Sequence, residues 1–188
     1  MMEHFYQNIS GFMNPRNTIM LDHVIAEMPA KCNWVELGSW TGRSAAYCAV
    51  ELINQHKFGT FTTVDSWHGG VELKDNDLVI NKSIKEVFLE NVEPIRDRIQ
   101  TIESISWNAA KHFDDQSLDF CYVDAGHTYD DVMKDLRAWW PKIKRGGWFG
   151  GDDYTKGYLG LMEAVQEFFK KKGIRVKKMG RCWIIQKV

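Results

Sequence analysis

The sequence lacks several features that mark membrane, secreted and nucleic-acid-binding proteins. No apolar run in its 188 residues approaches the ~18 residues that a membrane-spanning helix needs. Its 24 Lys and Arg residues stand against 25 Asp and Glu, so it has no basic excess for phosphates or anionic lipid. Its first residues contain neither a cationic start nor a continuous apolar core. We therefore expect a small-molecule partner, neither nucleic acid nor membrane, and a cytoplasmic location.

Cysteine is too sparse and too widely spaced for a disulfide framework or a CxxC metal motif. Cys32, Cys48, Cys121 and Cys182 lie in apolar stretches, which predicts buried thiols in a reducing compartment. A chain of this length buries roughly 70% of its unfolded surface, enough for a core without covalent links. We expect one domain over residues 1–188, with a short N-terminal helical segment over residues 1–30.

Short β-rich runs alternate with amphipathic stretches of helix length, as in βαβ units around a parallel sheet. The expected strands are 33–37, 60–64, 98–103, 118–123 and 146–151. The expected helices are 16–28, 43–55, 83–91, 107–113, 129–140 and 159–171, with a loop over 66–80. Two strands around Gly180 should close the sheet as a hairpin. The predicted fold is α/β: a Rossmann-like three-layer αβα sandwich whose mostly parallel seven-stranded sheet ends in an antiparallel C-terminal hairpin.

Four residues come directly after predicted strands: Gly38, Asp65, Asp124 and Asp152. Ligands of open parallel sheets bind beyond the carboxyl ends of the strands, near the switch in strand order. The sequence therefore predicts that these four residues converge on one site.

The turn after the first strand, residues 36–44, reads ELGSWTGRS. It lacks the GxGxxG spacing of dinucleotide-binding turns and the GxxxxGK[ST] pattern of P-loops. Its glycines allow close approach to the backbone, and the following helix offers free N–H groups to a carboxylate. This favours a smaller ligand with an amino acid at one end, although a purely structural turn is the alternative.

Asp65 stands 23 residues after Gly42, at the end of the second predicted strand. A carboxylate in this position can accept two hydrogen bonds from a ribose diol. A helix cap or a turn former is the alternative interpretation for a single aspartate.

Three carboxylates and a histidine follow the fourth and fifth strands: Asp124, His127, Asp152 and Asp153. The carboxylates would repel one another unless protons or a cation intervened, and Mg²⁺ is the hard, oxygen-seeking ion that suits them. His127 could exchange a proton near neutral pH. A structural imidazole and a pair of helix caps are the alternatives.

In this order, the motifs resemble class I S-adenosylmethionine-dependent methyltransferases. Residues 118–129 (LDFCYVDAGHTY) and 139–154 (WWPKIKRGGWFGGDDY) resemble the cation-dependent branch of catechol-type, sugar and related small-molecule O-methyltransferases. The resemblance covers roughly residues 30–188. It departs at His127, where catechol-type enzymes have a lysine base, and at Gly126, where relatives often carry a larger residue.

The resemblance implies S-adenosyl-L-methionine as the cofactor and assigns residues to it. The methionine end would be held by Gly38, Trp40, Gly42 and Ser44, with Glu36 supporting the turn; the ribose by Asp65 with Ser66 and Trp67 beside it; and the adenine by Ser104, Ser106 and Trp107. Asp124 would border the cofactor and, with Asp152 and Asp153, hold a divalent cation such as Mg²⁺. Apart from the resemblance, Trp40, Trp67 and Trp107 stand at predicted turns, where an exposed indole can serve a ligand.

The activity implied is metal-assisted O-methylation of a small hydroxylated acceptor such as a vicinal diol or catechol. His127 and Asp124 would be the catalytic residues, with His127 removing the hydroxyl proton. One alternative is a protein that binds the cofactor without methyl transfer, as an accessory or hydroxylase-like protein. Another is a nicotinamide-dependent oxidoreductase, which the missing GxGxxG disfavours. A homodimer is left open.

Overall fold

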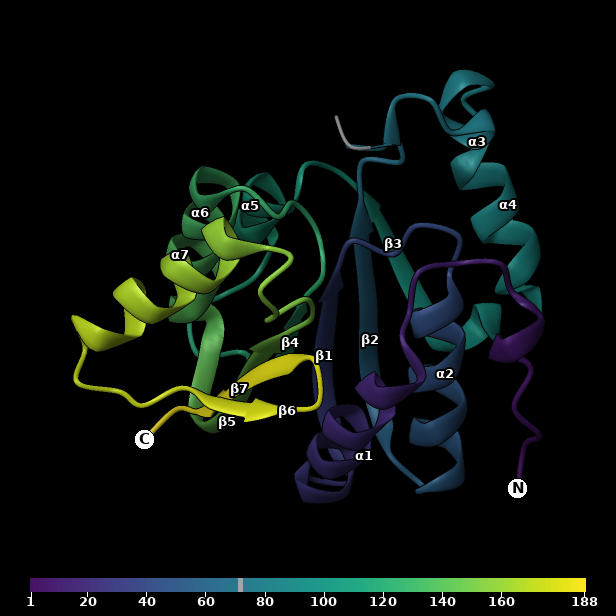
Figure 1. The fold of residues 1–188 in the computed structure, drawn as a ribbon. Coiled ribbons are helices and arrows are strands. Elements are labelled where there is room, and N and C mark those ends of the chain that lie inside the picture. Colours follow the sequence, from purple (N-terminus) through teal and green to yellow (C-terminus); the bar gives the residue numbers. More distant parts are fainter. Residues whose placement is uncertain (71–72) are drawn as a thin grey trace.

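The computed structural model describes residues 1–70 and 73–188, and its centre is one seven-stranded sheet (Figure 1). The strands are β1 (Lys31–Leu37), β2 (Phe58–Asp65), β3 (Ile99–Glu103), β4 (Leu118–Val123), β5 (Ile143–Gly151), β6 (Lys177–Met179) and β7 (Cys182–Gln186). Their order is β3-β2-β1-β4-β5-β7-β6. The first five strands are parallel, and β7 runs antiparallel to both β5 and β6. This confirms the predicted fold class.

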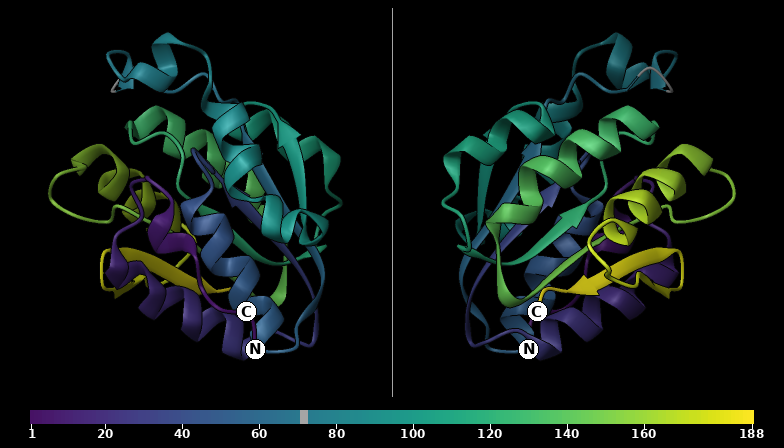
Figure 2. Two further views of the ribbon diagram at one scale, coloured as in Figure 1. Left: turned by 90° about the vertical axis from the view of Figure 1, so that its right-hand side faces the viewer. Right: turned by 90° about the vertical axis from the view of Figure 1, so that its left-hand side faces the viewer.

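Helices cover both faces of the sheet (Figures 1 and 2). They are α1 (Thr18–Glu27), α2 (Arg43–Asn54), α3 (Asp77–Ile80), α4 (Ile84–Asn91), α5 (Ser106–Ala109), α6 (Tyr129–Trp139) and α7 (Leu159–Lys170). Short 3₁₀ turns occur at Tyr6–Asn8, Pro15–Asn17, Glu93–Arg98, Ala110–His112 and Trp140–Lys142. Apolar side chains of α1, α2 and α4 pack on one face, and those of α5, α6 and α7 pack on the other.

The central strands alternate between two hydrophobic cores. In β4, Phe120 and Tyr122 belong to the core under α1 and α2, whereas Cys121 and Val123 belong to the core under α6 and α7. Successive side chains of a strand point to opposite faces, so a strand covered on both sides is mostly apolar. All six residues of β4 are buried, including Asp119 near its amino end, which accepts hydrogen bonds from Asn33 N–H and Lys144.

Several expected boundaries were wrong. The loop expected over 66–80 contains α3, because the Asn76 side chain accepts a hydrogen bond from the Leu78 N–H and starts a helical turn; residues 71–72 lie outside the described residues. The helix expected over 107–113 is an α-helical turn that ends at Ala109, followed by a 3₁₀ turn. Strand β5 begins at Ile143, three residues earlier than expected, because Ile143 already pairs with Leu118 of β4.

The four cysteines are buried and form no disulfide, as expected. Within the described ranges, no helix combines the length and the apolar character that a membrane crossing requires.

Candidate active site

The residues after the parallel strands are held side by side by an extension of the sheet's hydrogen bonds. The Gly38 N–H donates to the Val64 carbonyl of β2 at 2.8 Å. The Asp124 N–H donates to Leu37 of β1 at 2.8 Å, and the Asp152 N–H donates to Val123 of β4 at 3.1 Å. These bonds cross the point where β1 has β2 on one side and β4 on the other. The backbones of Gly38, Asp124 and Asp152 therefore lie together at this edge, with Asp65 at the end of β2 beside them, and that the four residues share one site stays a prediction.

The turn after β1 requires glycine at two positions. Gly38 has φ +85°, and a Cβ atom there would lie 1.9 Å from the Asp124 carbonyl oxygen. Gly42 has φ +90°, and its Cβ would lie 2.8 Å from a methyl group of Val92. The chain of β1 can therefore approach Asp124 only because residue 38 has no side chain.

Helix α2 starts directly after this turn and has no side-chain cap at its amino end. Its first turn contains no acidic residue, so the helix itself supplies no carboxylate to its first N–H groups. Free N–H groups and the helix dipole together favour a bound anion. Ser44, in this first turn, is buried beneath the site.

Asp65 stabilises the glycine turn by accepting hydrogen bonds from its backbone. Its Oδ2 accepts hydrogen bonds from the N–H groups of Ser39 and Trp40, both at 2.8 Å, and its Oδ1 accepts from Trp67 N–H at 2.8 Å. A carboxylate has about four acceptor positions, so these three bonds leave room for another donor. The observed role of Asp65 is that of a turn former, and its binding to a ribose stays a prediction.

The expected exposure of the Trp67 indole was wrong. Trp67 is 5% exposed, packs against Phe88 and donates its indole N–H to the Trp40 carbonyl at 3.1 Å. The Trp67 ring therefore supports the glycine turn from its buried side. Trp40 is only partly buried, with its ring centroid 5.5 Å from that of Phe12. Ser66, between Asp65 and Trp67, accepts a hydrogen bond from His68 N–H.

The segment predicted to hold adenine lies next to Asp65. Ser104 N–H donates to the Asp65 carbonyl at 2.9 Å, so the chain leaving β3 follows the end of β2. Ser106 is buried, and Trp107 is partly buried with the Lys134 ammonium 4.4 Å from its ring centroid.

Glu36 lies fully buried beneath the glycine turn. Among the described residues, neither of its carboxylate oxygens has a hydrogen-bond partner of standard geometry. Burial raises the pKa of Glu36 to about 7, against the lowering effect of the nearby Ser44 and Ser39 hydroxyls. The group can therefore change its charge near neutral pH.

The site contains a group of possible metal ligands formed by Asp124, His127 and Asp153. Each offers one ligand atom, and these atoms lie within 4.8 Å of one another. His127 Nε2 is 3.1 Å from Asp153 Oδ2, and the His127 ring lies against that of Tyr158, with centroids 4.3 Å apart. Two carboxylates and an imidazole form a donor set that a divalent cation can use.

The pKa values of the two carboxyl groups, Asp124 and Asp153, are shifted in opposite directions. Burial and the carboxylates of Asp152 and Asp153 raise the pKa of Asp124 well above its usual value. Burial also acts to raise the pKa of Asp153, but contacts with His127 and Arg181 outweigh it and lower that pKa. A bound cation or a proton would relieve the repulsion around Asp124.

Asp152 is buried beside this group, and its oxygens are engaged by other protein groups. It is 4% exposed, and its Oδ2 accepts a hydrogen bond from the Asn17 side chain while its Oδ1 accepts from Asp153 N–H at 2.6 Å. Of the three carboxylates predicted to bind a metal, the structure thus brings Asp124 and Asp153 together with His127, whereas Asp152 is outside the group of neighbouring ligand atoms. Its metal role stays a prediction.

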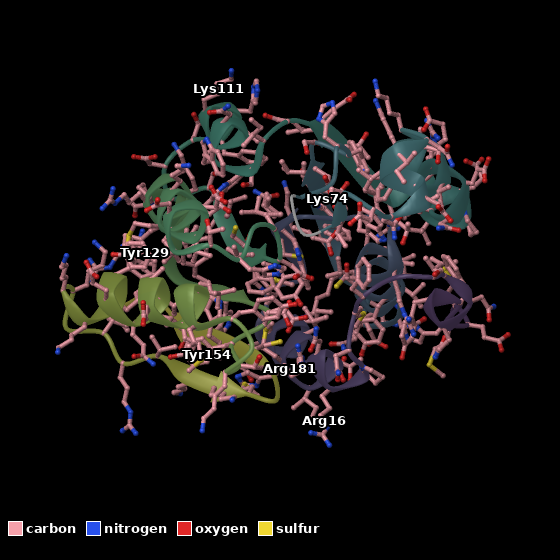
Figure 3. All side chains as sticks on the ribbon, turned by 45° about the horizontal axis from the view of Figure 1, so that its top comes forward. Arg16, Lys74, Lys111, Tyr129, Tyr154 and Arg181 are labelled. Carbon is pink, nitrogen blue, oxygen red and sulfur yellow. The ribbon has the colours of Figure 1, made fainter. Side chains whose placement is uncertain are left out.

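Sequence reasoning missed two residues that orient these carboxylates. Asn17 reaches Asp152 from the N-terminal segment, and Arg181 of the C-terminal hairpin contacts Asp153 Oδ1 at 2.5 Å. The segments that carry them meet, since a Cβ on Gly180 would lie 2.9 Å from the Arg16 carbonyl oxygen. Figure 3 shows Arg16 and Arg181, the neighbours of Asn17 and Gly180, in the same region of the molecule. Neither residue belongs to a recognisable motif, and each lies far along the chain from its partner.

Comparison with known proteins gives a family match. A family model described as a methyltransferase domain matches residues 35–154. This range contains the glycine turn, Asp65, Asp124, His127, Asp152 and Asp153. A comparison with curated proteins finds no match.

Solved structures share the fold. The O-methyltransferase NovP superposes with a TM-score of 0.72 at 17% identity, covering 92% of this chain and 80% of that chain. Cofactor-bound Rv0187 from MTB gives 0.67 at 12% identity, covering 92% and 80%. The TDP-rhamnose 3′-O-methyltransferase CalS11 gives 0.59 at 13% identity, covering 91% and 78%. At these identities the likeness shows the fold alone.

Proposed function

The chain belongs to this family of methyltransferase domains, because the match covers well over half of its length, and we propose that it transfers a methyl group from S-adenosylmethionine to a hydroxyl of a small acceptor, assisted by a divalent cation. The observation that carries this proposal is the group of Asp124, His127 and Asp153, which adjoins the glycine turn through the contact between Gly38 and Asp124. A turn suited to the cofactor and a group suited to a hydroxyl acceptor thus share one edge of the sheet.

The chain offers a partner for each end of the cofactor. The uncapped amino end of α2 would bind the methionine carboxylate. Gly38 would let the ligand approach the backbone, and the buried Glu36 below it would favour a nearby ammonium group. Asp65 would accept the ribose hydroxyls, with Ser104, Ser106 and Trp107 beside the adenine.

Asp124 and Asp153 would supply oxygen ligands to the cation, with Asp152 as the third carboxylate of the resemblance. The cation, when bound, lowers the pKa of a coordinated hydroxyl and orients neighbouring oxygens. Two neighbouring oxygens are the feature of a vicinal diol or catechol, which is the acceptor class we propose.

His127 would accept the proton of the acceptor hydroxyl. Its Nε2 faces Asp153 at 3.1 Å, and a neutral ring that donates this N–H to the carboxylate carries its lone pair on Nδ1. Asp153 would thereby set the tautomer and orientation of the base, and Arg181 would hold Asp153 in turn. Hydroxyl acceptors also accord with the names of the fold relatives NovP and CalS11, both O-methyltransferases.

Calorimetric titration with S-adenosylhomocysteine tests the cofactor, with NADH as the control ligand and with Mg²⁺ present or absent. We expect 1:1 binding that is weakened in Asp65→Asn, a variant that retains the size of the side chain. A screen of diols and catechols for S-adenosylhomocysteine release then tests transfer. Binding without any product would favour the cofactor-binding alternative, and an NADH signal alone would favour the oxidoreductase.

A further inference from the structure

The His127 imidazole is in contact with other side chains at its edge and on its face. At the edge, His127 Nε2 lies 3.1 Å from Asp153 Oδ2. On the face, the ring centroid of Tyr158 lies 4.3 Å from that of His127, with the two ring planes 30° from parallel. The two contacts therefore constrain the imidazole in different directions.

The edge contact alone leaves one rotation of the imidazole weakly restricted. Rotation about the Cβ–Cγ bond of histidine has no sharply preferred angle, and it moves Nδ1 more than Nε2, which lies nearer the axis. A flat ring packed against one face opposes this rotation, because turning the imidazole drives its edge into the neighbouring ring. The Tyr158 ring therefore restricts the direction of Nδ1, the atom that carries the lone pair in the proposed function.

One short segment, residues 153–158, supplies both contacts. Thr155 N–H donates to the Asp153 carbonyl at 2.7 Å, and Tyr158 N–H donates to the Thr155 carbonyl at 3.0 Å. These two turns fix the spacing between Asp153, which contacts the edge of the imidazole, and Tyr158, which contacts its face.

The start of α7, directly after Tyr158, lies against the backbone that carries His127. Helices α6 and α7 run side by side (Figures 1 and 2). A Cβ on Gly160 would lie 2.9 Å from the Tyr129 nitrogen and 3.6 Å from the His127 carbonyl oxygen. A side chain at residue 160 would therefore push the start of α7, and Tyr158 with it, away from His127.

We propose that Tyr158 is a positioning residue that holds the plane of the His127 imidazole, so that Nδ1 is directed at the acceptor hydroxyl. This inference rests on the proposed function, because it takes His127 as the group that accepts the proton. Tyr158 acts through His127, by the face of its ring and not by its hydroxyl group. Gly160 allows the close approach that brings the two rings together.

Steady-state kinetics with S-adenosylmethionine and catechol compare Tyr158→Leu with Tyr158→Phe. Tyr158→Leu should lower kcat about 10–100-fold, the effect of a reacting group displaced by about 1 Å, and leave KM for S-adenosylmethionine within about twofold. Tyr158→Phe retains the ring and should stay within about threefold of wild type. In a His127→Ala background, Tyr158→Leu should lower kcat no further, because its effect passes through the imidazole.

Gly160→Ala tests the same contact without changing the tyrosine. It should lower kcat about tenfold, since the new Cβ would meet the Tyr129 nitrogen. Gly157→Ala is the matched control. Gly157 is exposed, and a Cβ there would meet only Thr155 Oγ1, at an ordinary contact distance of 3.6 Å. Its substitution should leave kcat unchanged.

A second readout needs no turnover. In protein whose six histidines carry ¹³C at Cε1, the His127 signal is assigned with His127→Ala. The ¹³C relaxation of this signal measures the motion of the ring on the picosecond-to-nanosecond time scale. The mobility of the His127 ring should rise in Tyr158→Leu and in Gly160→Ala, and stay at the wild-type level in Tyr158→Phe.

Either a wild-type kcat or an unchanged mobility of the His127 ring in Tyr158→Leu would overturn the inference. Equal losses of kcat in Tyr158→Phe and Tyr158→Leu would overturn it as well, since the hydroxyl group would then be what matters. A further loss in the His127→Ala background would do the same, because it would indicate a general effect on the fold. If the wild-type protein methylates neither catechol nor any other acceptor of the screen, the proposed function fails, and ring mobility alone decides whether Tyr158 holds His127.

Discussion

Asn17 and Asp152, 135 residues apart in sequence, form a buried hydrogen bond in which the Asn17 amide donates to the carboxylate. The same amide lies 3.4 Å from the Tyr122 hydroxyl. This contact joins the segment before α1 to the end of β5, and it engages one carboxylate oxygen of Asp152. The orientation of a carboxylate at the candidate active site thus depends on a residue from the other end of the chain.

Replacing Asn17 with alanine should destabilise the protein by about 2–4 kcal/mol, because a buried carboxylate loses its side-chain donor. Urea unfolding measures the change. Asn14→Ala is the control: Asn14 caps the preceding 3₁₀ turn through an exposed hydrogen bond to Arg16 N–H, so its loss should cost about 1 kcal/mol. Equal effects would show that Asn17 acts as no more than a local turn former.

Gly38→Ala should abolish S-adenosylhomocysteine binding and strongly reduce stability, since the new Cβ would meet the Asp124 carbonyl oxygen. Gly146→Ala separates the backbone strain from this clash. Gly146 also has a positive φ, +80°, but a Cβ there meets nothing within 4 Å. Its substitution should cost only about 1–2 kcal/mol. Thermal unfolding and calorimetry of both variants test the difference, and a Gly38→Ala variant that binds normally would contradict it.

Glu36 should make stability fall as the pH rises between about 4.5 and 7. Its pKa in the folded protein, about 7, exceeds its ordinary value, so the folded state holds a proton that the unfolded state releases across this range. From pH 5 to pH 8, the free energy of unfolding should therefore decrease by up to about 3 kcal/mol less in Glu36→Gln than in wild type. The exposed Glu163→Gln should behave as wild type. Parallel pH profiles for wild type and Glu36→Gln would disprove the assignment.

His127→Ala should lower kcat for methyl transfer by about 10²–10⁴-fold, the usual effect of removing a general base. The affinity for S-adenosylhomocysteine should stay within about twofold, because the proposed cofactor contacts lie elsewhere. Product formation measured by mass spectrometry tests the rate. His68→Ala, which removes an exposed histidine beside the Asp65 turn, should leave the rate unchanged. Normal turnover in His127→Ala would remove the base assignment.

Binding of Mn²⁺, followed by electron paramagnetic resonance, should weaken by about tenfold or more in Asp124→Asn and in Asp153→Asn. Asp152→Asn should weaken it less, because the Asp152 oxygens are engaged by Asn17 and by the Asp153 N–H. His127→Ala should leave Mn²⁺ affinity within about threefold if His127 is the base. A large loss in His127→Ala would instead make the imidazole a metal ligand, and unchanged binding in all four variants would exclude the site.

The amino-acid sequence alone determined the order of the elements and the edge of the sheet at which the candidate residues gather. Alternation of apolar residues in strands such as β4, and the polar residues Asp124 and Asp152 directly after strands, are local patterns that follow from chain geometry. The requirement for glycine at residue 38 is equally visible in the motif. Even so, the short helix α3 was missed, because its capping residue, Asn76, also reads as a loop residue.

Only the tertiary structure decided how the side chains at this edge are oriented. It turned Asp152 toward Asn17, Asp153 toward His127 and Arg181, and the Trp67 indole into the core. These partners come from the N-terminal segment and the C-terminal hairpin, whose approach depends on how both pack against the sheet. Local periodicity carries no information about such packing, since a contact across many residues depends on all the elements between them.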